Sequence, residues 1–545
     1  MKISANYVDI KNRQIFPATL VIEDKKIKSI HKNNEVYQNY IIPGFVDAHI
    51  HIESSMLVPT EFAKIALSHG TVATVCDPHE IANVLGVEGV EYMIDNAKKS
   101  SLKFNFGAPS CVPATAFETS GATINSKDIK ELLARDDISH LSEMMNYPGV
   151  IYDDAEVIAK ITYAKQANKP IDGHAPGLVG GNLDKYIDAG ISTDHEAYSY
   201  EEGLEKIKKG MKILIREGSA AKDFDSLIDL LKDYSDSCMF CSDDKNPNDL
   251  IKGHIDELVK RAVKNGYNKF DVLQVACINP VEHYNLDVGL LQENDKADFV
   301  VVDSLDEFNV IKTFIDGELV YEKGKTIFES LKIEIVNNFN TNKKNIEDFR
   351  IKFQNDSIKV IKAMDRELLT KVLEKKPKVV DGFVVSDLEK DILKIAVINR
   401  YKNEEVAVAF IEGFGLKSGA IASSIAHDSH NIIVVGCDDE SILKAVNIVI
   451  EKKGAIVALN ASKEHILELK IAGLMSDKDA STVAKQYKKI NSFVKDELKS
   501  NLNSPFMTLS FMALLVIPDI KLGDMGLFDG TNFQFTNIFT KNSPE

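Results

Sequence analysis

Between residues 41 and 290, apolar β-rich runs alternate eight times with helix-like stretches such as Pro59–His69 and Val87–Lys99. The eight runs are Ile41–Ile50, Val72–Asp77, Phe104–Pro109, Leu141–Met145, Pro170–His174, Ile191–Glu196, Lys212–Glu217 and Met239–Asp243. Continuous apolar runs are typical of parallel strands covered on both faces. Eight successive strand–helix units predict a closed (β/α)8 barrel. The alternative fold is an open doubly wound sheet. A Gly-x-Gly-x-x-Gly turn after the first strand would favour it, and this sequence has none there.

Short β-rich segments precede and follow this α/β region. We expect residues 1–40 and 291–330 to form one small, discontinuous β-sandwich domain around the barrel of residues 41–290. The polar, Lys- and Asn-rich segment 331–350 predicts a linker. Further strand and helix patterns predict a C-terminal α+β domain over residues 350–545.

Net charge, the length of apolar runs and cysteine content argue against several classes of protein. The 545 residues carry a net charge of −17, which argues against a general nucleic-acid or anionic-membrane surface. The N-terminus shows no signal pattern, and no apolar run approaches the ~20 residues that a membrane-spanning helix needs. Six sparse cysteines favour a reduced, cytoplasmic protein. Cys238 and Cys241 form a Cys-x-x-Cys, but residues three apart on a strand face opposite sides, which disfavours a redox or metal role.

In a barrel, functional side chains lie at the carboxyl ends of the strands. His49 and His51 are two residues apart on the first strand, so both imidazoles face one side and can bind one ion. Four later strand ends carry one metal-binding side chain each: Glu143, His174, His195 and Asp243. Any single one of the six has a structural alternative as a turn or buried residue. All six at strand ends, in barrel order, predict a metal centre.

Four histidines and two carboxylates exceed what one catalytic ion with an open position takes. We therefore expect two divalent ions that share Glu143, one bound by His49, His51 and Asp243 and the other by His174 and His195. Manganese, iron and zinc all suit these ligands, with manganese or iron expected. A hydroxide between two ions is a nucleophile at neutral pH, and Asp243 is expected to act as general base beside it.

Seven further residues are candidates for substrate binding: His79, Glu80, Arg216, Glu217, Ser219, His427 and His430. The first two follow strand two, where a loop capped by Asp77 is the alternative. Arg216 and Glu217 end strand seven and form either a contact to substrate or a structural ion pair. His427 and His430 lie in the C-terminal region, where a buried, hydrogen-bonded role is the alternative.

This ligand pattern and the flanking two-piece sheet resemble the amidohydrolase superfamily. Within it, the chain resembles the bacterial adenine deaminase family over nearly its whole length. The segments that carry the resemblance are Pro43–Leu57, Cys76–Gly86, Ser142–Val150, Asp172–Leu178, Thr193–Glu196, Cys241–Asp244 and Ala426–Gly436. Many relatives such as hydantoinases carry a carboxylated lysine at strand four. Glu143 stands there instead, which favours the deaminase branch.

The resemblance implies a purine-salvage enzyme that converts adenine and water to hypoxanthine and ammonia. Hydroxide would attack C6 of the ring, N1 would take a proton, and ammonia would leave. Two alternatives stay open: a cyclic-amide or amide hydrolase of the same superfamily, and a non-catalytic metal-binding scaffold. A symmetric homo-oligomer, a dimer, is the expected assembly.

Overall fold

The computed structural model describes residues 1–328, 332–365 and 367–540, and the chain separates into two compact units. The first unit contains Met1–His79, Val90–Cys111 and Asn125–Lys332. The second contains Glu80–Gly89, Val112–Ile124 and Ile333–Glu545. The finer division into three domains stays a prediction.

Eight parallel strands form the barrel of the first unit. They are β5 (Phe45–Ile50), β6 (Thr71–Cys76), β7 (Lys103–Ala108), β8 (Ile138–Met144), β9 (Ile171–Gly173), β10 (Thr193–Asp194), β11 (Lys212–Arg216) and β12 (Cys238–Cys241). Strands β5 to β9 pair in sequence order, and so do β10 to β12. The Ser192 N–H donates to the Ile171 carbonyl at 3.0 Å, and a parallel bridge between Ile50 and Asp243 joins the last strand to the first. The predicted barrel and its strand order are therefore confirmed.

Helices follow the barrel strands. They are α1 (Pro59–Ser68), α2 (His79–Leu85), α3 (Val87–Ala97), α4 (Ser126–Leu133), α5 (Tyr147–Ile151), α6 (Ala155–Gln166), α7 (Gly180–Asp188), α8 (Tyr200–Lys208), α9 (Phe224–Leu227), α10 (Leu231–Tyr234), α11 (Pro247–Leu250), α12 (Ile255–Lys264), α13 (Lys269–Leu273) and α14 (Asn279–Tyr284). Side-chain caps fix several starts: Asp154 accepts the N–H of Glu156 and Val157 before α6, and Ser199 accepts that of Glu202 before α8.

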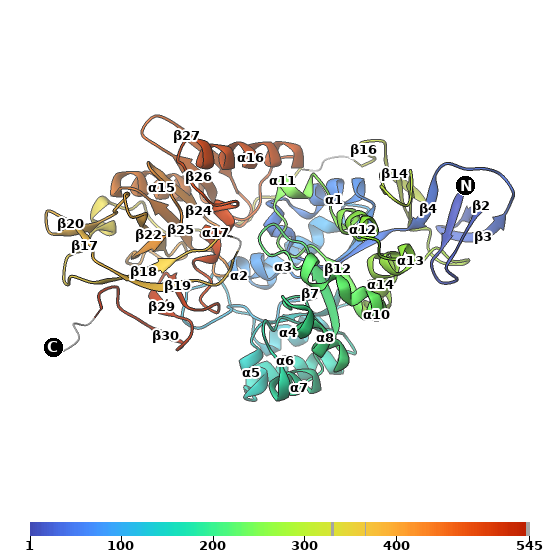
Figure 1. The fold of residues 1–545 in the computed structure, drawn as a ribbon, viewed down its shortest axis with the longest axis horizontal. Coiled ribbons are helices and arrows are strands. Elements are labelled where there is room, and N and C mark those ends of the chain that lie inside the picture. The colour runs from blue at the N-terminus through green and yellow to red at the C-terminus, as the bar shows by residue number, and fades with distance from the viewer. Residues whose placement is uncertain (329–331, 366, 541–545) are drawn as a thin grey trace. The chain divides into compact units, whose positions relative to one another are not determined.

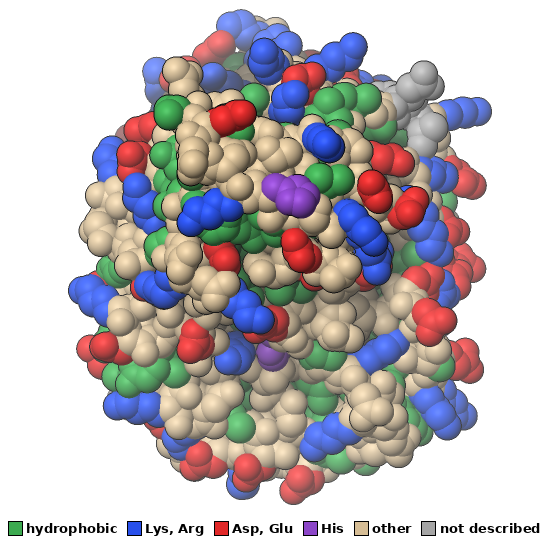
Figure 2. All heavy atoms as spheres, turned by 90° about the vertical axis from the view of Figure 1, so that its right-hand side faces the viewer, with side chains coloured by type: hydrophobic (Ala, Val, Ile, Leu, Met, Phe, Trp, Pro, Cys, Tyr) green, Lys and Arg blue, Asp and Glu red, His purple; other side chains and the backbone are tan. Residues whose placement is uncertain are grey.

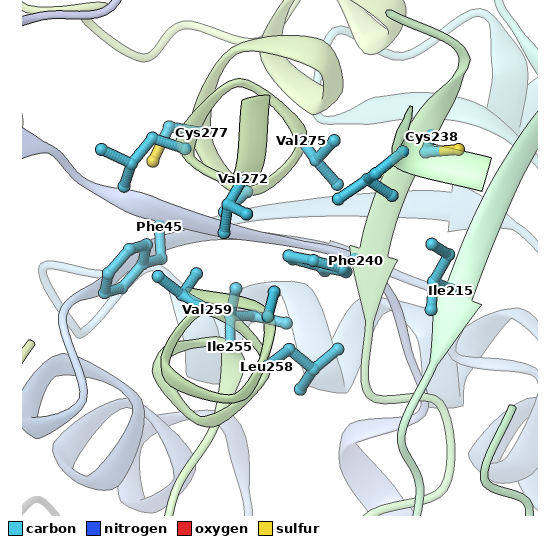
Figure 3. Packing of buried hydrophobic residues seen from close by; sticks show 14 of the residues in the cluster. Phe45, Ile215, Cys238, Phe240, Ile255, Leu258, Val259, Val272, Val275 and Cys277 are labelled. Atoms are coloured by element: carbon cyan, nitrogen blue, oxygen red, sulfur yellow. The ribbon is translucent and has the colours of Figure 1, made fainter. Parts of the chain in front are cut away.

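An apolar layer joins these helices to the strands. On α12, Ile255, Leu258 and Val259 are spaced three and four residues apart and therefore share one face. Figure 3 shows this face and residues from a second helical segment meeting Phe45 of β5 and Phe240 of β12. All five side chains are buried, and burying one such side chain stabilises the fold by ~1.5–3 kcal/mol.

The Cys-x-x-Cys lies on β12 and places its two thiols on opposite faces. Cys238 belongs to the layer between strands and helices, whereas Cys241 belongs to a different buried cluster. All six cysteines of the chain are free and buried. The pair is thus part of the hydrophobic packing, in line with its spacing.

One sheet combines strands from both sides of the barrel segment in the sequence. Its order is β16-β15-β14-β13-β4-β1-β2-β3. The strands are β1 (Lys2–Asp9), β2 (Gln14–Glu23), β3 (Lys26–Lys32), β4 (Tyr40–Pro43), β13 (Phe299–Val302), β14 (Val310–Ile315), β15 (Glu318–Glu322) and β16 (Lys325–Thr326). In Figure 1 the blue N-terminal strands and the yellow-green β14 lie side by side.

Ile41 and Ile42 are a correction to the predicted first barrel strand. They lie in β4 and pair with Val301 and Val300 of β13, so the barrel strand begins only at Phe45. The chain changes sheets at Gly44, where a Cβ atom would collide with the side chain of Val72. A close approach of this kind needs glycine, and it ends one strand before the next begins.

The face of the first unit seen in Figure 2 carries both signs of charge. Figure 2 shows acidic and basic side chains interspersed, with hydrophobic side chains scattered between them. No continuous basic field covers the face in that view, which agrees with the net charge of −17. Within the described residues, none of the helices has the length and hydropathy required to span a membrane.

The second unit is built on an eight-stranded sheet of order β19-β18-β23-β22-β25-β24-β26-β27. Its strands are β18 (Ile358–Lys362), β19 (Lys371–Lys375), β22 (Ile392–Ile398), β23 (Ala407–Glu412), β24 (Ala420–Ser423), β25 (Ile432–Gly436), β26 (Ala455–Leu459) and β27 (Glu464–Glu468). The remaining elements are β17 (Ile351–Lys352), β20 (Lys378–Val380), β21 (Phe383–Val385), β28 (Ile520–Gly523), β29 (Gly526–Asp529), β30 (Gln534–Phe535), α15 (Asp439–Lys452), α16 (Ala480–Asp496) and α17 (Pro505–Phe511). Mixed strands and helices confirm the predicted α+β character of this region.

The predicted linker is packed rather than free over its described part. Asn337 donates from Nδ2 to the Lys453 carbonyl at 2.6 Å, and Lys344 donates from Nζ to Asn403 Oδ1 at 2.9 Å. Phe339 between them is buried. The polar side chains of this segment therefore form hydrogen bonds with nearby backbone and side-chain groups. Residue 331, the first of the predicted linker, lies outside the described residues.

Replacing Gly173 with Ala should destabilise the junction between β9 and β10. A Cβ atom at Gly173 would collide with the Thr193 carbonyl oxygen, and overpacking of this kind typically costs ~1–3 kcal/mol. The matched control is Gly181→Ala in α7, where a Cβ atom meets nothing within 4 Å. It should be neutral, or stabilising by ~0.5–1 kcal/mol. Urea unfolding midpoints measure both, and equal midpoints would contradict the packing argument.

Candidate metal centre

Four imidazoles and two carboxylates converge at the carboxyl end of the barrel. His49 lies in β5 and His51 follows it, Glu143 lies in β8, His174 and His195 directly follow β9 and β10, and Asp243 comes two residues after β12. Five of these six side chains are buried, and His174 is half-buried. The structure thus brings together all six side chains that the sequence placed at strand ends.

One half of the centre is formed by the first and last strands. His49 Nε2 lies 3.2 Å from His51 Nε2, and Asp243 Oδ1 lies 3.5 Å and 3.2 Å from these two nitrogens. His51 Nδ1 lies 3.0 Å from the Asp77 carbonyl oxygen. A hydrogen bond from Nδ1–H to that carbonyl leaves the Nε2 lone pair to face the centre, which is the tautomer that a metal ligand requires.

Glu143 joins this half to the other. Its Oε1 lies 3.2 Å from His51 Nε2, whereas its Oε2 lies 2.7 Å from His174 Nδ1 and 3.2 Å from His195 Nε2. His195 also stacks on His49, with ring centroids 4.1 Å apart. One carboxylate oxygen therefore faces each group of imidazoles, the arrangement required of a ligand that bridges two ions.

The close packing of imidazoles and carboxylates shifts the pKa values of these groups. Burial acts to raise the pKa of Glu143, but His174 and His195 outweigh it and hold this pKa well below its usual range. Burial acts to lower the pKa of His195, but Glu143 outweighs it and raises the pKa to about 9. Nitrogen atoms as close as those of His49 and His51 need a cation or proton between them. Buried imidazole and carboxylate donors in this number fit divalent transition-metal ions.

A fully buried hydrogen-bond network behind the centre ties β5 to β12. Asp47 Oδ1 accepts the N–H of Ser242 at 3.0 Å, and Asp47 Oδ2 lies 2.7 Å from His254 Nε2. His254 Nδ1 is in turn 2.7 Å from Thr71 Oγ1. The network fixes the strand ends that carry His49 and Asp243. Sequence reasoning missed it, although the Asp two residues before the His-x-His was a signal.

Arg216 reaches the centre from the end of β11. It donates to Asp243 Oδ2 at 3.0 Å, to Asp223 Oδ2 at 2.9 Å and to Glu196 Oε2 at 3.2 Å. Glu196 Oε1 lies 3.7 Å from His195 Nε2 and 3.8 Å from His174 Nδ1. Glu196 is therefore a third carboxylate at this site. It went unassigned because the sequence signal was the histidine beside it.

Two other candidates after β11 contact residues outside the centre instead. Glu217 pairs with Arg261 at 3.1 Å and with Lys222 at 3.2 Å. Ser219 donates from Oγ to Asp249 Oδ2 at 2.8 Å and accepts the N–H of Asn246 at 2.9 Å. Side chains alternate along extended backbone, which is why Arg216 faces the centre and Glu217 does not.

The remaining candidates fall into two groups. In the first unit, His79 Nδ1 lies 3.1 Å from Asp77 Oδ2 and 3.3 Å from Glu143 Oε1, beside the centre. In the second unit, the Glu80 carboxylate contacts His427 Nδ1 at 2.6 Å through Oε1 and His430 Nε2 through Oε2. Glu80, His427 and His430 are all buried and form one cluster.

Comparisons with known proteins agree with this geometry. Residues 40–320 match the family model of the amidohydrolase family, and residues 367–534 match that of the adenine deaminase C-terminal domain. An adenine deaminase from Sulfurovum sp. (strain NBC37-1) is 55% identical over 98% of this chain and 99% of its own length. An adenine deaminase from Salinibacter ruber is 52% identical over 98% of each chain, and one from Borreliella burgdorferi is 50% identical over 98% and 99%.

The two family models match parts of both compact units, and these relatives align over 98% of this chain. The barrel and the C-terminal sheet both lie within these alignments. The chain belongs to the amidohydrolase family and, within it, to the adenine deaminases.

Proposed function

We propose that this chain hydrolyses adenine to hypoxanthine and ammonia, a reaction of purine salvage. Family membership supports the reaction, and the observation that carries it is Glu143, whose two carboxylate oxygens face two groups of imidazoles. A centre of this kind suits hydrolytic attack on a ring carbon that bears an amino group. The products balance the substrates: adenine and water give hypoxanthine and ammonia.

Six residues are proposed to hold two divalent ions. His49, His51 and Asp243 would bind one ion, His174 and His195 the other, and Glu143 both. When bound, such ions supply a nucleophile derived from water at neutral pH. Manganese or iron is the proposed metal, and the ligand set also suits zinc.

Asp243 is proposed as the general base and Glu143 as a second catalytic residue. Asp243 takes the proton of the attacking water and passes it to the leaving amino group. Its Oδ2 accepts a hydrogen bond from Arg216 at 3.0 Å, so Oδ1 stays directed at His49 and His51. Arg216 thus orients the base while it neutralises part of the buried negative charge.

A substrate contact is proposed for His79 in the first unit. The position of His79 supports this role, because the imidazole lies beside Glu143 and is not one of the six proposed metal ligands. Glu80, His427 and His430 form a cluster of their own in the second unit and stay predicted substrate-binding residues. Glu80 accepts from both imidazoles, so its carboxylate is fixed in orientation. For Arg216, Glu217 and Ser219 the contacts favour positioning of the site and its loops over direct contact with adenine.

The experiment is to load the purified protein with Mn²⁺ and to measure ammonia release from adenine and, separately, ring opening of a cyclic amide such as dihydrouracil. We expect hypoxanthine and ammonia in equal amounts from adenine, and no ring opening of the amide. Amide hydrolysis without adenine turnover would favour the alternative hydrolase. Tight metal binding without turnover of either compound would favour a scaffold.

The assembly and location are proposed as a homodimer in the cytoplasm. A closed symmetric dimer is the commonest arrangement of oligomeric enzymes, and six free, buried thiols suit a reducing compartment.

A further inference from the structure

Lys206 on α8 is a lysine with no exposed surface. Its Nζ donates to the Ala175 carbonyl at 2.7 Å, to Asp194 Oδ2 at 2.9 Å and to Glu202 Oε1 at 2.6 Å. Lysines are almost never fully buried unless they are paired, because burying an unpaired charge is very unfavourable. Three acceptors satisfy all three donors of this ammonium group.

Two of the three acceptors belong to the segments that carry the second group of imidazoles, and the third, Glu202, lies on α8 itself. Ala175 directly follows His174, and Asp194 directly precedes His195. Asp194 Oδ1 also accepts the N–H of Ala175 at 2.8 Å. Lys206 and Asp194 together therefore bind both backbone groups of Ala175.

Glu202 extends this contact by two residues along the same loop. Its Oε1 accepts the N–H of Gly177 at 2.8 Å in addition to the bond from Lys206. Helix α8 thus binds the loop after β9 at two points, through Ala175 and through Gly177.

The barrel needs such a connection at this place. Strand β9 has 3 residues and β10 has 2, against 6 in β5 and 7 in β8. Short strands contribute few ladder hydrogen bonds, so the ends of β9 and β10 are weakly fixed by pairing alone. His174 and His195 follow these ends directly.

We propose that Lys206, with Asp194 and Glu202, is a positioning cluster that holds His174 and His195 in place for one of the two ions. The inference rests on the two-ion centre of the proposed function. It goes further because it assigns the affinity of one ion to residues that bind no metal themselves. Partners behind metal ligands typically contribute ~10–100-fold to metal affinity.

The test uses two variants on α8 and two matched controls, one on α8 and one directly after it. Glu202→Gln weakens the cluster mildly, and Lys206→Met removes its cation. The controls are Glu205→Gln and Lys209→Met. Glu205 Oε1 accepts the N–H of Gly180 at 2.9 Å at the start of α7, and Lys209 pairs with Glu205 at 3.6 Å at the protein surface.

We expect each cluster variant to bind one ion ~10–100-fold more weakly while the other ion keeps its affinity. After dialysis against a chelator, elemental analysis should find close to one ion per chain in the variants and two in the wild type and both controls. Added Mn²⁺ should restore most adenine turnover of Glu202→Gln, which a general loss of folding would not allow.

Two results are decisive against the proposal. If both folded variants retain two ions with wild-type affinity, the cluster has only a structural role, whatever happens to the melting temperature. If Lys206→Met fails to fold, Glu202→Gln alone decides. A wild-type protein that binds fewer than two ions would instead refute the two-ion centre itself, and adenine turnover of that same sample tests the proposed reaction separately.

Discussion

Replacing Asp243 with Asn is expected to remove nearly all adenine turnover while the fold stays intact. The amide keeps the shape of the side chain and one oxygen, but it cannot take a proton from water. Loss of a general base commonly costs ~10²–10⁴-fold in rate. The backbone tolerates the change, because Asp243 has φ of 50° and asparagine is one of the few residues that adopt this left-handed conformation readily.

The measurement is kcat for ammonia release, together with the metal content of the same sample. Asp244→Asn is the matched control, since the neighbouring carboxylate accepts a hydrogen bond from Ser54 Oγ and lies outside the proposed ligand set. The control should lose less than ~10-fold, below the range for loss of a base. If Asp243→Asn turned over adenine at close to the wild-type rate with two ions bound, another group would have to be the base.

The barrel was predictable because its signal repeats. Eight apolar runs alternate with helix-like stretches, and most of them end in polar residues, so a parallel barrel with a functional carboxyl end follows from this repeated pattern. The proposed ligands sit at these ends, for example His49 and His51, which is why a single sequence pointed to them. Their convergence is a property of the structure, and their role as ligands remains our proposal.

Contacts that join distant segments were not predictable in the same way. Asp47 and Ser242 are 195 residues apart, and Lys206 and Ala175 are 31 apart. No local pattern signals such pairs, because each depends on how two loops approach after the barrel has closed. Gly44 is a related case: its role in the change from β4 to β5 depends on its closeness to Val72, which the sequence alone does not show.

Replacing Glu143 with Gln is expected to lower the metal content from two ions per chain to about one. In the wild-type protein, Glu143 Oε1 lies 3.2 Å from His51 Nε2. Its Oε2 lies 2.7 Å from His174 Nδ1 and 3.2 Å from His195 Nε2. An amide has one oxygen acceptor and one NH2 donor, so it can serve only one of these sides. It also removes the negative charge that balances two cations in a buried site.

Elemental analysis after gel filtration in metal-free buffer measures this change, with Glu205→Gln as the control for the substitution itself. Retention of two tightly bound ions would rule out a bridging role for Glu143. Turnover should fall together with the ion count, because attack on adenine needs the nucleophile that the pair of ions supplies. A variant with one ion and wild-type turnover would show that a single ion suffices, and the ion bound by His49, His51 and Asp243 would then be the catalytic one, since the general base belongs to that group.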